Sequence, residues 1–116
     1  GEGGTTDVLY PDKYKYDICK SEPLVMDFTG GTTDREYTFT FTKLSDNSES
    51  KVDIIMPTNR RVTIVTDGSK GFALPVGEYS LNITSDWTDG ETNYPNKIRV
   101  IVHPKTSAWK KKCKLY

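Results

Sequence analysis

Residues 36–42 read Glu-Tyr-Thr-Phe-Thr-Phe-Thr, and residues 78–84 read Glu-Tyr-Ser-Leu-Asn-Ile-Thr. In both stretches, large apolar side chains alternate with small polar ones. A period of two places all the apolar side chains on one face of a β-strand, so each stretch can cover one side of a core. The two stretches therefore predict a core enclosed by β-strands.

Short runs with strand-forming composition recur along the rest of the chain, separated by clusters of Gly, Pro, Asn and Asp. The predicted strands are residues 14–19, 24–29, 36–43, 51–56, 61–66, 71–74, 78–85, 97–103 and 109–115. This pattern predicts an all-β fold, an antiparallel sandwich of about seven to nine strands. The expected core residues are Phe28, Phe39, Phe41, Ile64, Leu81, Ile83, Val100 and Val102.

Length and charge exclude several classes of protein. The 116 residues are enough for one domain with its own core. Sixteen basic residues balance sixteen acidic ones, so net charge gives no argument for a nucleic acid or a membrane surface as partner. No run approaches the ~20 apolar residues of a membrane-spanning helix. The Gly- and Thr-rich start suggests a flexible tether over residues 1–12, followed by a single β-sandwich domain over residues 13–116.

The two cysteines, Cys19 and Cys113, lie near opposite ends of the chain. Their spacing resembles no zinc site. A disulfide between them would close almost the whole domain into a loop, which the chain-entropy estimate values at roughly 4 to 5 kcal/mol. We expect this disulfide, and with it an extracellular or cell-surface location, with two unpaired thiols as the alternative.

Residues 71–79 read Gly-Phe-Ala-Leu-Pro-Val-Gly-Glu-Tyr, a short apolar strand, a Pro-x-Gly turn and a strand that opens on Tyr79. Pro presets φ at the first corner of such a turn, and Gly accepts the positive φ that follows. The segment resembles a hairpin of extracellular immunoglobulin-like and prealbumin-like β-sandwich modules from bacterial surface and adhesive proteins. The resemblance implies a sandwich in an exported protein and assigns no functional residue.

The longest predicted connection, residues 85–96, is the candidate ligand site, because long ordered loops often carry binding. Aromatic rings beside carboxylates and amides are a common arrangement for sugar binding. The candidate ligand-binding residues are Trp87, Tyr94, Asp86, Asp89 and Asn93. Three alternatives stay open: a tryptophan that fills the core, a protein interface, and calcium held by these oxygen donors with Glu91. The spacing matches no EF-hand loop, so we assign no metal.

Three further features have both a structural and a functional interpretation. The tripeptide Asn82-Ile83-Thr84 matches the N-glycosylation sequon, with Asn82 on the outward face of its strand. Lys110, Lys112 and Lys114 either protect an edge strand from pairing or contact a polyanion. His103, the single histidine, lies at a predicted strand end with no nucleophile motif nearby. We therefore predict neither an enzyme nor a cofactor.

These observations together predict a non-enzymatic binding or adhesion module of an exported or cell-surface protein. Its partner would be a glycan or a protein, engaged through loops or through one sheet face. Two alternatives come from other classes of protein. One is a structural subunit of a virion, tail or filament, with the edge strands as its interface. The other is a lipid-carrying sandwich whose two sheets part to admit a ligand.

Overall fold

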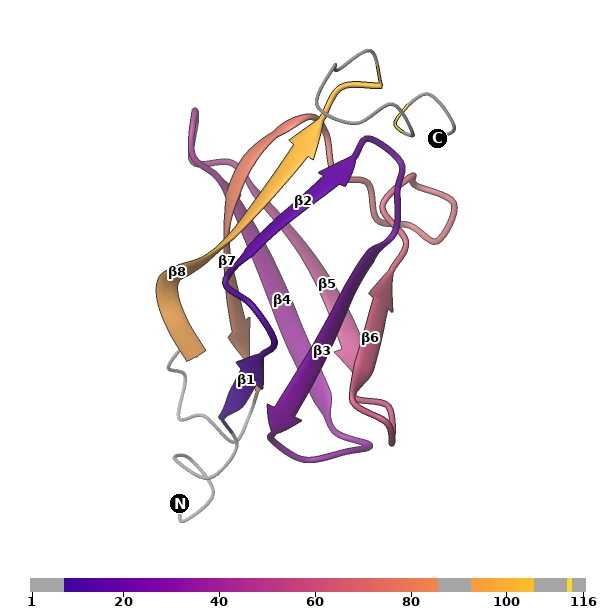
Figure 1. Cartoon of the computed structure of the whole chain (residues 1–116), viewed down its shortest axis with the longest axis vertical. Coiled ribbons are helices and arrows are strands. Elements are labelled where there is room, and N and C mark those ends of the chain that lie inside the picture. Colours follow the sequence, from indigo (N-terminus) through magenta and orange to yellow (C-terminus); the bar gives the residue numbers. More distant parts are fainter. Residues whose placement is uncertain (1–7, 86–92, 106–112, 114–116) are drawn as a thin grey trace.

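The computed structural model describes residues 8–85, 93–105 and 113, and these form eight strands in two sheets. The strands are β1 (Leu9–Pro11), β2 (Lys15–Cys19), β3 (Leu24–Gly30), β4 (Glu36–Lys43), β5 (Glu49–Ile55), β6 (Arg61–Ile64), β7 (Gly77–Thr84) and β8 (Asn93–His103). In Figure 1, β3 and β6 of one sheet pass in front of β4 and β5 of the other. The prediction of an all-β fold with two packed sheets is confirmed.

The smaller sheet has the order β1-β3-β6, and the larger one has the order β2-β8-β7-β4-β5. All pairs are antiparallel except β2 and β8, which run parallel from Lys15 opposite Arg99 to Cys19 opposite His103. The expectation of purely antiparallel sheets is therefore wrong. Residue alternation decides which face of a strand is buried, but it carries no information on the direction of a partner so distant in sequence.

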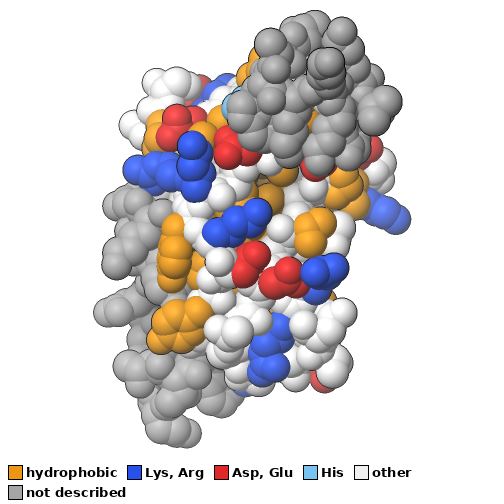
Figure 2. Space-filling model, viewed as in Figure 1, with side chains coloured by type: hydrophobic (Ala, Val, Ile, Leu, Met, Phe, Trp, Pro, Cys, Tyr) orange, Lys and Arg blue, Asp and Glu red, His pale blue; other side chains and the backbone are white. Residues whose placement is uncertain are grey.

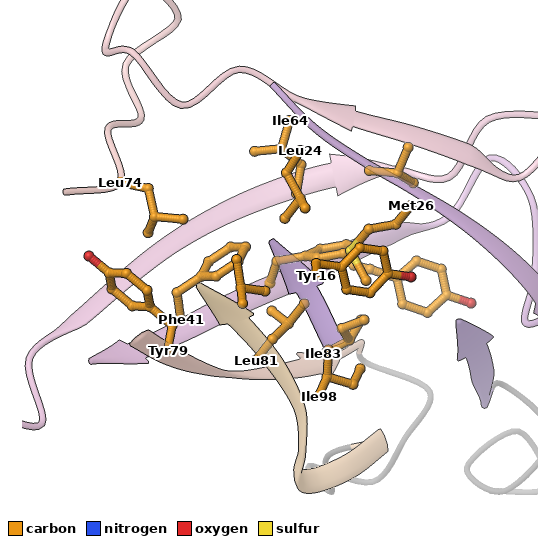
Figure 3. Packing of buried hydrophobic residues seen from close by; sticks show 14 of the residues in the cluster. Tyr16, Leu24, Met26, Phe41, Ile64, Leu74, Tyr79, Leu81, Ile83 and Ile98 are labelled. Atoms are coloured by element: carbon orange, nitrogen blue, oxygen red, sulfur yellow. The ribbon is translucent and has the colours of Figure 1, made fainter. Parts of the chain in front are cut away.

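The core lies between the two sheets. All eight predicted core residues are buried, and Phe39, Phe41, Leu81, Ile83 and Val100 have no exposed surface. Figure 3 shows Leu24, Met26 and Ile64 on one side of this layer and Leu81, Ile83 and Ile98 on the other. The rings of Phe28 and Phe39 meet edge to face at 6.0 Å between centroids. The alternation in β4 and β7 therefore forms one wall of the core, as the sequence predicts.

Several predicted strand limits differ from the structure. Residues 71–74 form no strand, because only one isolated bridge, Asp67 with Ala73, pairs this segment. Phe72 and Leu74 are nevertheless buried, and Figure 3 places Leu74 beside Phe41 and Tyr79 at the end of the core layer. These apolar residues thus cover the core without joining a sheet. The strand predicted at residues 109–115 lies outside the described residues, except for Cys113.

Strand β1 lies in the segment that the sequence suggested as a tether, and Leu9 in it is fully buried. It pairs with the end of β3, with Leu9 opposite Gly30. Gly31 follows at φ 65°, a conformation that suits glycine. A Cβ atom on Gly31 would overlap the Leu9 side chain and lie 2.8 Å from the Tyr37 hydroxyl. The absence of a side chain there allows β1 to close one end of the sandwich.

Cys19 and Cys113 form a disulfide, with Cα atoms 5.1 Å apart and a sequence separation of 94. The expected pairing is confirmed. Since Cys19 is the last residue of β2, the bond ties this edge strand to the C-terminal part of the chain.

Candidate functional site

The predicted ligand site falls mainly outside the described residues. Asp86, Trp87, Asp89 and Glu91 lie there, and so do Lys110, Lys112 and Lys114. Asn93 and Tyr94 belong to β8 and not to a loop, because the strand begins at Asn93, which pairs with Ile83 of β7. The register of β7 with β8 shifts between Leu81, opposite Ile98, and Ile83, opposite Asn93, so the start of β8 joins the sheet through an irregularity. Ligand binding by these residues stays a prediction.

The outward face of the larger sheet carries an array of small polar side chains that the sequence analysis did not single out. It consists of Thr38, Thr40 and Thr42 of β4 and Ser80, Asn82 and Thr84 of β7, and we call it the hydroxyl face. Ser80 is buried, at 3% exposed, and the other five side chains are partly exposed. The two strands pair in register, with Thr38 opposite Thr84, Thr40 opposite Asn82, and Thr42 opposite Ser80. The apolar residues between them point into the core, so alternation places these six on the other side.

Charged residues border the hydroxyl face on both sides. On β5, Lys51 lies opposite Thr40 and Asp53 lies opposite Thr38, whose hydroxyl donates a 2.7 Å hydrogen bond to Asp53 Oδ1. On β8, Arg99 lies opposite Ser80 and its Nε is 3.9 Å from Glu78 Oε2. The centre is therefore uncharged and rich in hydroxyl donors and acceptors, while its margins carry both signs of charge. The alternation in residues 36–42 and 78–84 already indicates a row of polar side chains on the outward face of each strand. Only the pairing of the two strands shows that these rows are adjacent.

Asn82 occupies the middle of this face and is partly buried. Its Oδ1 is inaccessible and accepts no hydrogen bond from the described part of the chain. An inaccessible amide oxygen without a donor costs free energy, and a ligand could supply that donor only after a rotation of the Asn82 side chain exposes the oxygen. The sequon asparagine does face outward, as expected from alternation. Glycan attachment to Asn82 stays a prediction.

The outward face of the smaller sheet is different in character. Arg61 of β6 and Asp27 of β3 form a two-point ion pair, with Nε–Oδ1 2.8 Å and Nη2–Oδ2 3.2 Å. These hydrogen bonds lower the pKa of the Asp27 carboxyl. Two apolar side chains of the same sheet are also exposed, Val25 on β3 and Tyr10 on β1. Figure 2 shows basic, acidic and apolar side chains interspersed on the side of the molecule on which β3 and β6 lie, with no large area of a single kind.

A group of polar contacts holds strand β2. Asp17 Oδ1 lies 2.9 Å from His103 Nε2 of β8. The Tyr16 hydroxyl donates a 2.5 Å hydrogen bond to Asp12 Oδ1. Burial, and then this hydrogen bond, raise the pKa of the Tyr16 phenol. His103 is thus part of a contact between neighbouring strands. Within residues 8–85, 93–105 and 113, no cluster of three or more His, Cys, Asp and Glu side chains could hold a metal ion.

No helix among the described residues has the length and apolarity needed to cross a membrane. In comparisons with known proteins, neither a family model nor a curated protein sequence matches this chain.

Proposed function

We propose that the chain is a non-enzymatic binding or adhesion module that binds a glycan through the hydroxyl face. The observation that carries the proposal is the in-register array of small polar side chains at the centre of the larger sheet, of which all but Ser80 are partly exposed. Sugar hydroxyls both donate and accept hydrogen bonds, and threonine, serine and asparagine side chains can match either role. A protein partner would favour large apolar or aromatic anchors. None of the residues of the hydroxyl face itself is a large apolar or aromatic residue, although Ile55 on neighbouring β5 is 56% exposed.

The connection from β7 to β8 supports the same proposal. Because Asn93 pairs with Ile83, the start of β8 lies beside the part of β7 that contains Asn82. Tyr94 is therefore in the strand next to β7, and Trp87 lies in the connection that precedes β8 in the sequence. We propose that these aromatic residues cover the C–H face of the sugar, with Asp86, Asp89 and Asn93 as further polar contacts.

The finer fold type that we propose is immunoglobulin-like, and the strand order supports it. An immunoglobulin-type sandwich has its first, second and fifth lettered strands in one sheet and its third, sixth and seventh in the other. Here β1, β3 and β6 share one sheet, and β4, β7 and β8 share the other, with β5 added beside β4. Tyr79, near the start of β7, donates a 2.6 Å hydrogen bond to the Pro75 carbonyl, which resembles the tyrosine corner of that fold.

We further propose that the module belongs to an exported or cell-surface protein. The Cys19–Cys113 disulfide supports this location, because disulfides persist mainly in oxidising compartments.

The test is a glycan array, followed by affinity measurements on the best ligand. Thr40→Val removes one hydroxyl from the centre of the hydroxyl face and keeps the branched shape. The matched control is Thr63→Val, an exposed threonine on the outward side of β6. One lost hydrogen bond should weaken binding about 5- to 10-fold, and the control should leave it unchanged. Trp87→Ala and Tyr94→Ala should weaken binding with an unchanged melting temperature. Binding to no glycan, or equal loss with both valine variants, would overturn the proposal.

A further inference from the structure

Strand β5 is an edge of the larger sheet, because its neighbour in the strand order is β4 alone. Two backbone hydrogen bonds, one just beyond each end of the β4–β5 ladder, show which residues of β5 are hydrogen-bonded to β4. Lys43 N donates to Ser48 O at 2.8 Å, and Met56 N donates to Arg35 O at 2.9 Å. Hydrogen-bonded and non-hydrogen-bonded pairs alternate along an antiparallel ladder. Ser50, Val52 and Ile54 therefore use their backbone groups on β4.

The other four residues of β5 direct their backbone N–H and C=O groups away from the sheet: Glu49, Lys51, Asp53 and Ile55. In the described part of the chain, no backbone–backbone bond outside the regular strand pairing involves these groups. All four residues are exposed, and the Ile55 side chain is 56% exposed. Among the residues that the structure describes, the edge of β5 thus presents a regular row of donors and acceptors without a backbone partner.

Most devices that prevent edge pairing are missing from β5. Its pairing with β4 runs without a bulge from Glu36 opposite Ile55 to Thr42 opposite Glu49. The strand contains no proline, and its inward-pointing residues, Ser50, Val52 and Ile54, carry no charge. Val52 and Ile54 pack against the core but remain partly exposed. Bulges, prolines, inward-pointing charges and exposed charged residues, lysine above all, are the usual means of blocking strand addition. Of these, β5 has only the exposed charges of Glu49, Lys51 and Asp53. An added strand would extend both the ladder and the core.

The positions of Lys51 and Asp53 on β5 favour pairing with a second copy of the same strand. We propose that β5 pairs with β5 of a second copy of this chain, antiparallel and with Val52 opposite Val52. In this register Lys51 lies opposite Asp53 of the second copy, and Asp53 lies opposite its Lys51, so two opposite-charge pairs form on the same face. All seven residues of the strand are paired, and the free backbone groups of both edges meet.

Neighbouring registers of the β5–β5 pair place like charges opposite each other and pair fewer residues. A shift of two residues in one direction places Lys51 opposite Lys51 and Glu49 opposite Asp53. The opposite shift places Asp53 opposite Asp53. Like charges directly opposite each other destabilise a strand pair, and each shift also shortens the overlap. A shift of one residue would place residues whose backbone groups are hydrogen-bonded to β4 in one copy opposite residues whose backbone groups point outward in the other copy. The sequence of β5 therefore specifies a single pairing with itself.

This pairing joins two five-stranded sheets into one continuous sheet. Lys51 and Asp53 lie on the outward face in both copies, so the two hydroxyl faces end on the same side of the dimer. Two equivalent faces on one rigid support would bind a repeating ligand with increased avidity. The dimer itself does not require the glycan proposal.

Sedimentation velocity from micromolar to millimolar concentration tests the dimer. The wild-type chain should show a concentration-dependent monomer–dimer equilibrium that weakens as salt is raised. Lys51→Asp and Asp53→Lys each place like charges opposite each other and should abolish the dimer. The double variant K51D/D53K restores two opposite-charge pairs and should recover it. Lys70→Asp, an exposed charge reversal in the turn after β6, is the matched control and should have no effect.

Amide hydrogen exchange identifies the interface directly. On dimerisation the amides of Glu49, Lys51, Asp53 and Ile55 should slow, while those of Ser50, Val52 and Ile54 are already protected by β4. Circular dichroism should show that each variant is folded. A monomer at all concentrations would overturn the proposal. So would a dimer that survives both single reversals, or one whose protection appears on another strand.

Discussion

The two edges of the larger sheet, β2 and β5, are held in very different ways. Strand β2 is fixed by covalent and side-chain contacts in addition to its ladder with β8. These contacts are the Cys19–Cys113 disulfide, the Asp17–His103 pair, the Tyr16–Asp12 hydrogen bond and the Lys13 ammonium 5.1 Å from the centre of the Tyr16 ring. Strand β5 is held through its hairpin and ladder with β4 and presents a regular row of free backbone groups.

This difference separates a structural edge from a candidate binding edge. The contacts on β2 hold a short strand beside β8, its distant partner in sequence, and they stabilise the closure of the domain. A strand that pairs with another molecule needs the opposite properties, namely a regular backbone and few local contacts to break. We therefore expect changes at β2 to alter folding stability and changes at β5 to alter association.

Removing the disulfide should give the largest effect on the β2 side. In Cys19→Ala/Cys113→Ala, the unfolded chain regains the freedom of a loop that spans a sequence separation of 94. The expected loss is about 4 kcal/mol in the free energy of unfolding. Urea unfolding of the wild type and the double variant measures it. A loss below about 1 kcal/mol would mean that β2 does not depend on its covalent tie.

Replacing one isoleucine by alanine on each edge strand compares how tightly β2 and β5 are packed against the core. Ile18 of β2 is 5% exposed, whereas Ile54 of β5 is only partly buried. Ile18→Ala should cost about 2–4 kcal/mol, and Ile54→Ala about 1–2 kcal/mol, because fewer core contacts are lost at β5.

Thermal and urea unfolding should be measured on dilute protein, where association through β5 does not contribute. Equal losses for the two variants would contradict the distinction between the edges. In concentrated samples the Ile54→Ala variant should additionally weaken association, and Ile18→Ala should not.

The smallest expected effect is a pH dependence that belongs to β2. The pKa of Tyr16 is raised in the folded state, so folding favours the neutral phenol. Its contribution is complete below the unfolded-state pKa, about 10, and is lost as pH rises above that value. Tyr16→Phe should cost about 1 kcal/mol near neutral pH through the lost hydrogen bond to Asp12.

Between pH 10 and 12 the wild type should lose stability faster than Tyr16→Phe, so the gap between the two should narrow (~1.4 kcal/mol per pH unit at most). Urea unfolding at a series of pH values measures this gap. The pKa of Tyr79 is also raised by burial, and its alkaline loss is common to both proteins. A gap that stays constant with pH would contradict the role assigned to the Tyr16 phenol.

Local sequence pattern predicted much of the scaffold. The limits of β4 coincide with the predicted 36–43, and the predicted core residues are all buried. Alternation is reliable here because each strand has one face against the core. The pattern failed at residues 71–74, where Phe72 and Leu74 are buried without a strand partner. A buried position favours an apolar residue whether or not its backbone belongs to a strand, so an apolar run does not by itself identify a strand.

Less of the candidate site could be predicted. The loop proposed from composition falls largely outside the described residues, and Asn93 and Tyr94 belong to β8. The hydroxyl face was missed because its two rows lie about 40 residues apart in the chain, and each row alone looks like an ordinary solvent-facing strand surface. Pairing of Thr40 with Asn82 in the sheet makes them one surface.

The sequence by itself determined the all-β class, the buried faces of the strands and the residues of the core, because a period of two acts within a few residues of the chain. It also singled out the disulfide, since the chain has only the pair Cys19 and Cys113. Tertiary structure decided the parallel pairing of β2 with β8, the adjacency of the two polar rows and the open edge at β5. These features depend on which distant segments become neighbours, and that choice follows from packing the whole core and not from any local pattern.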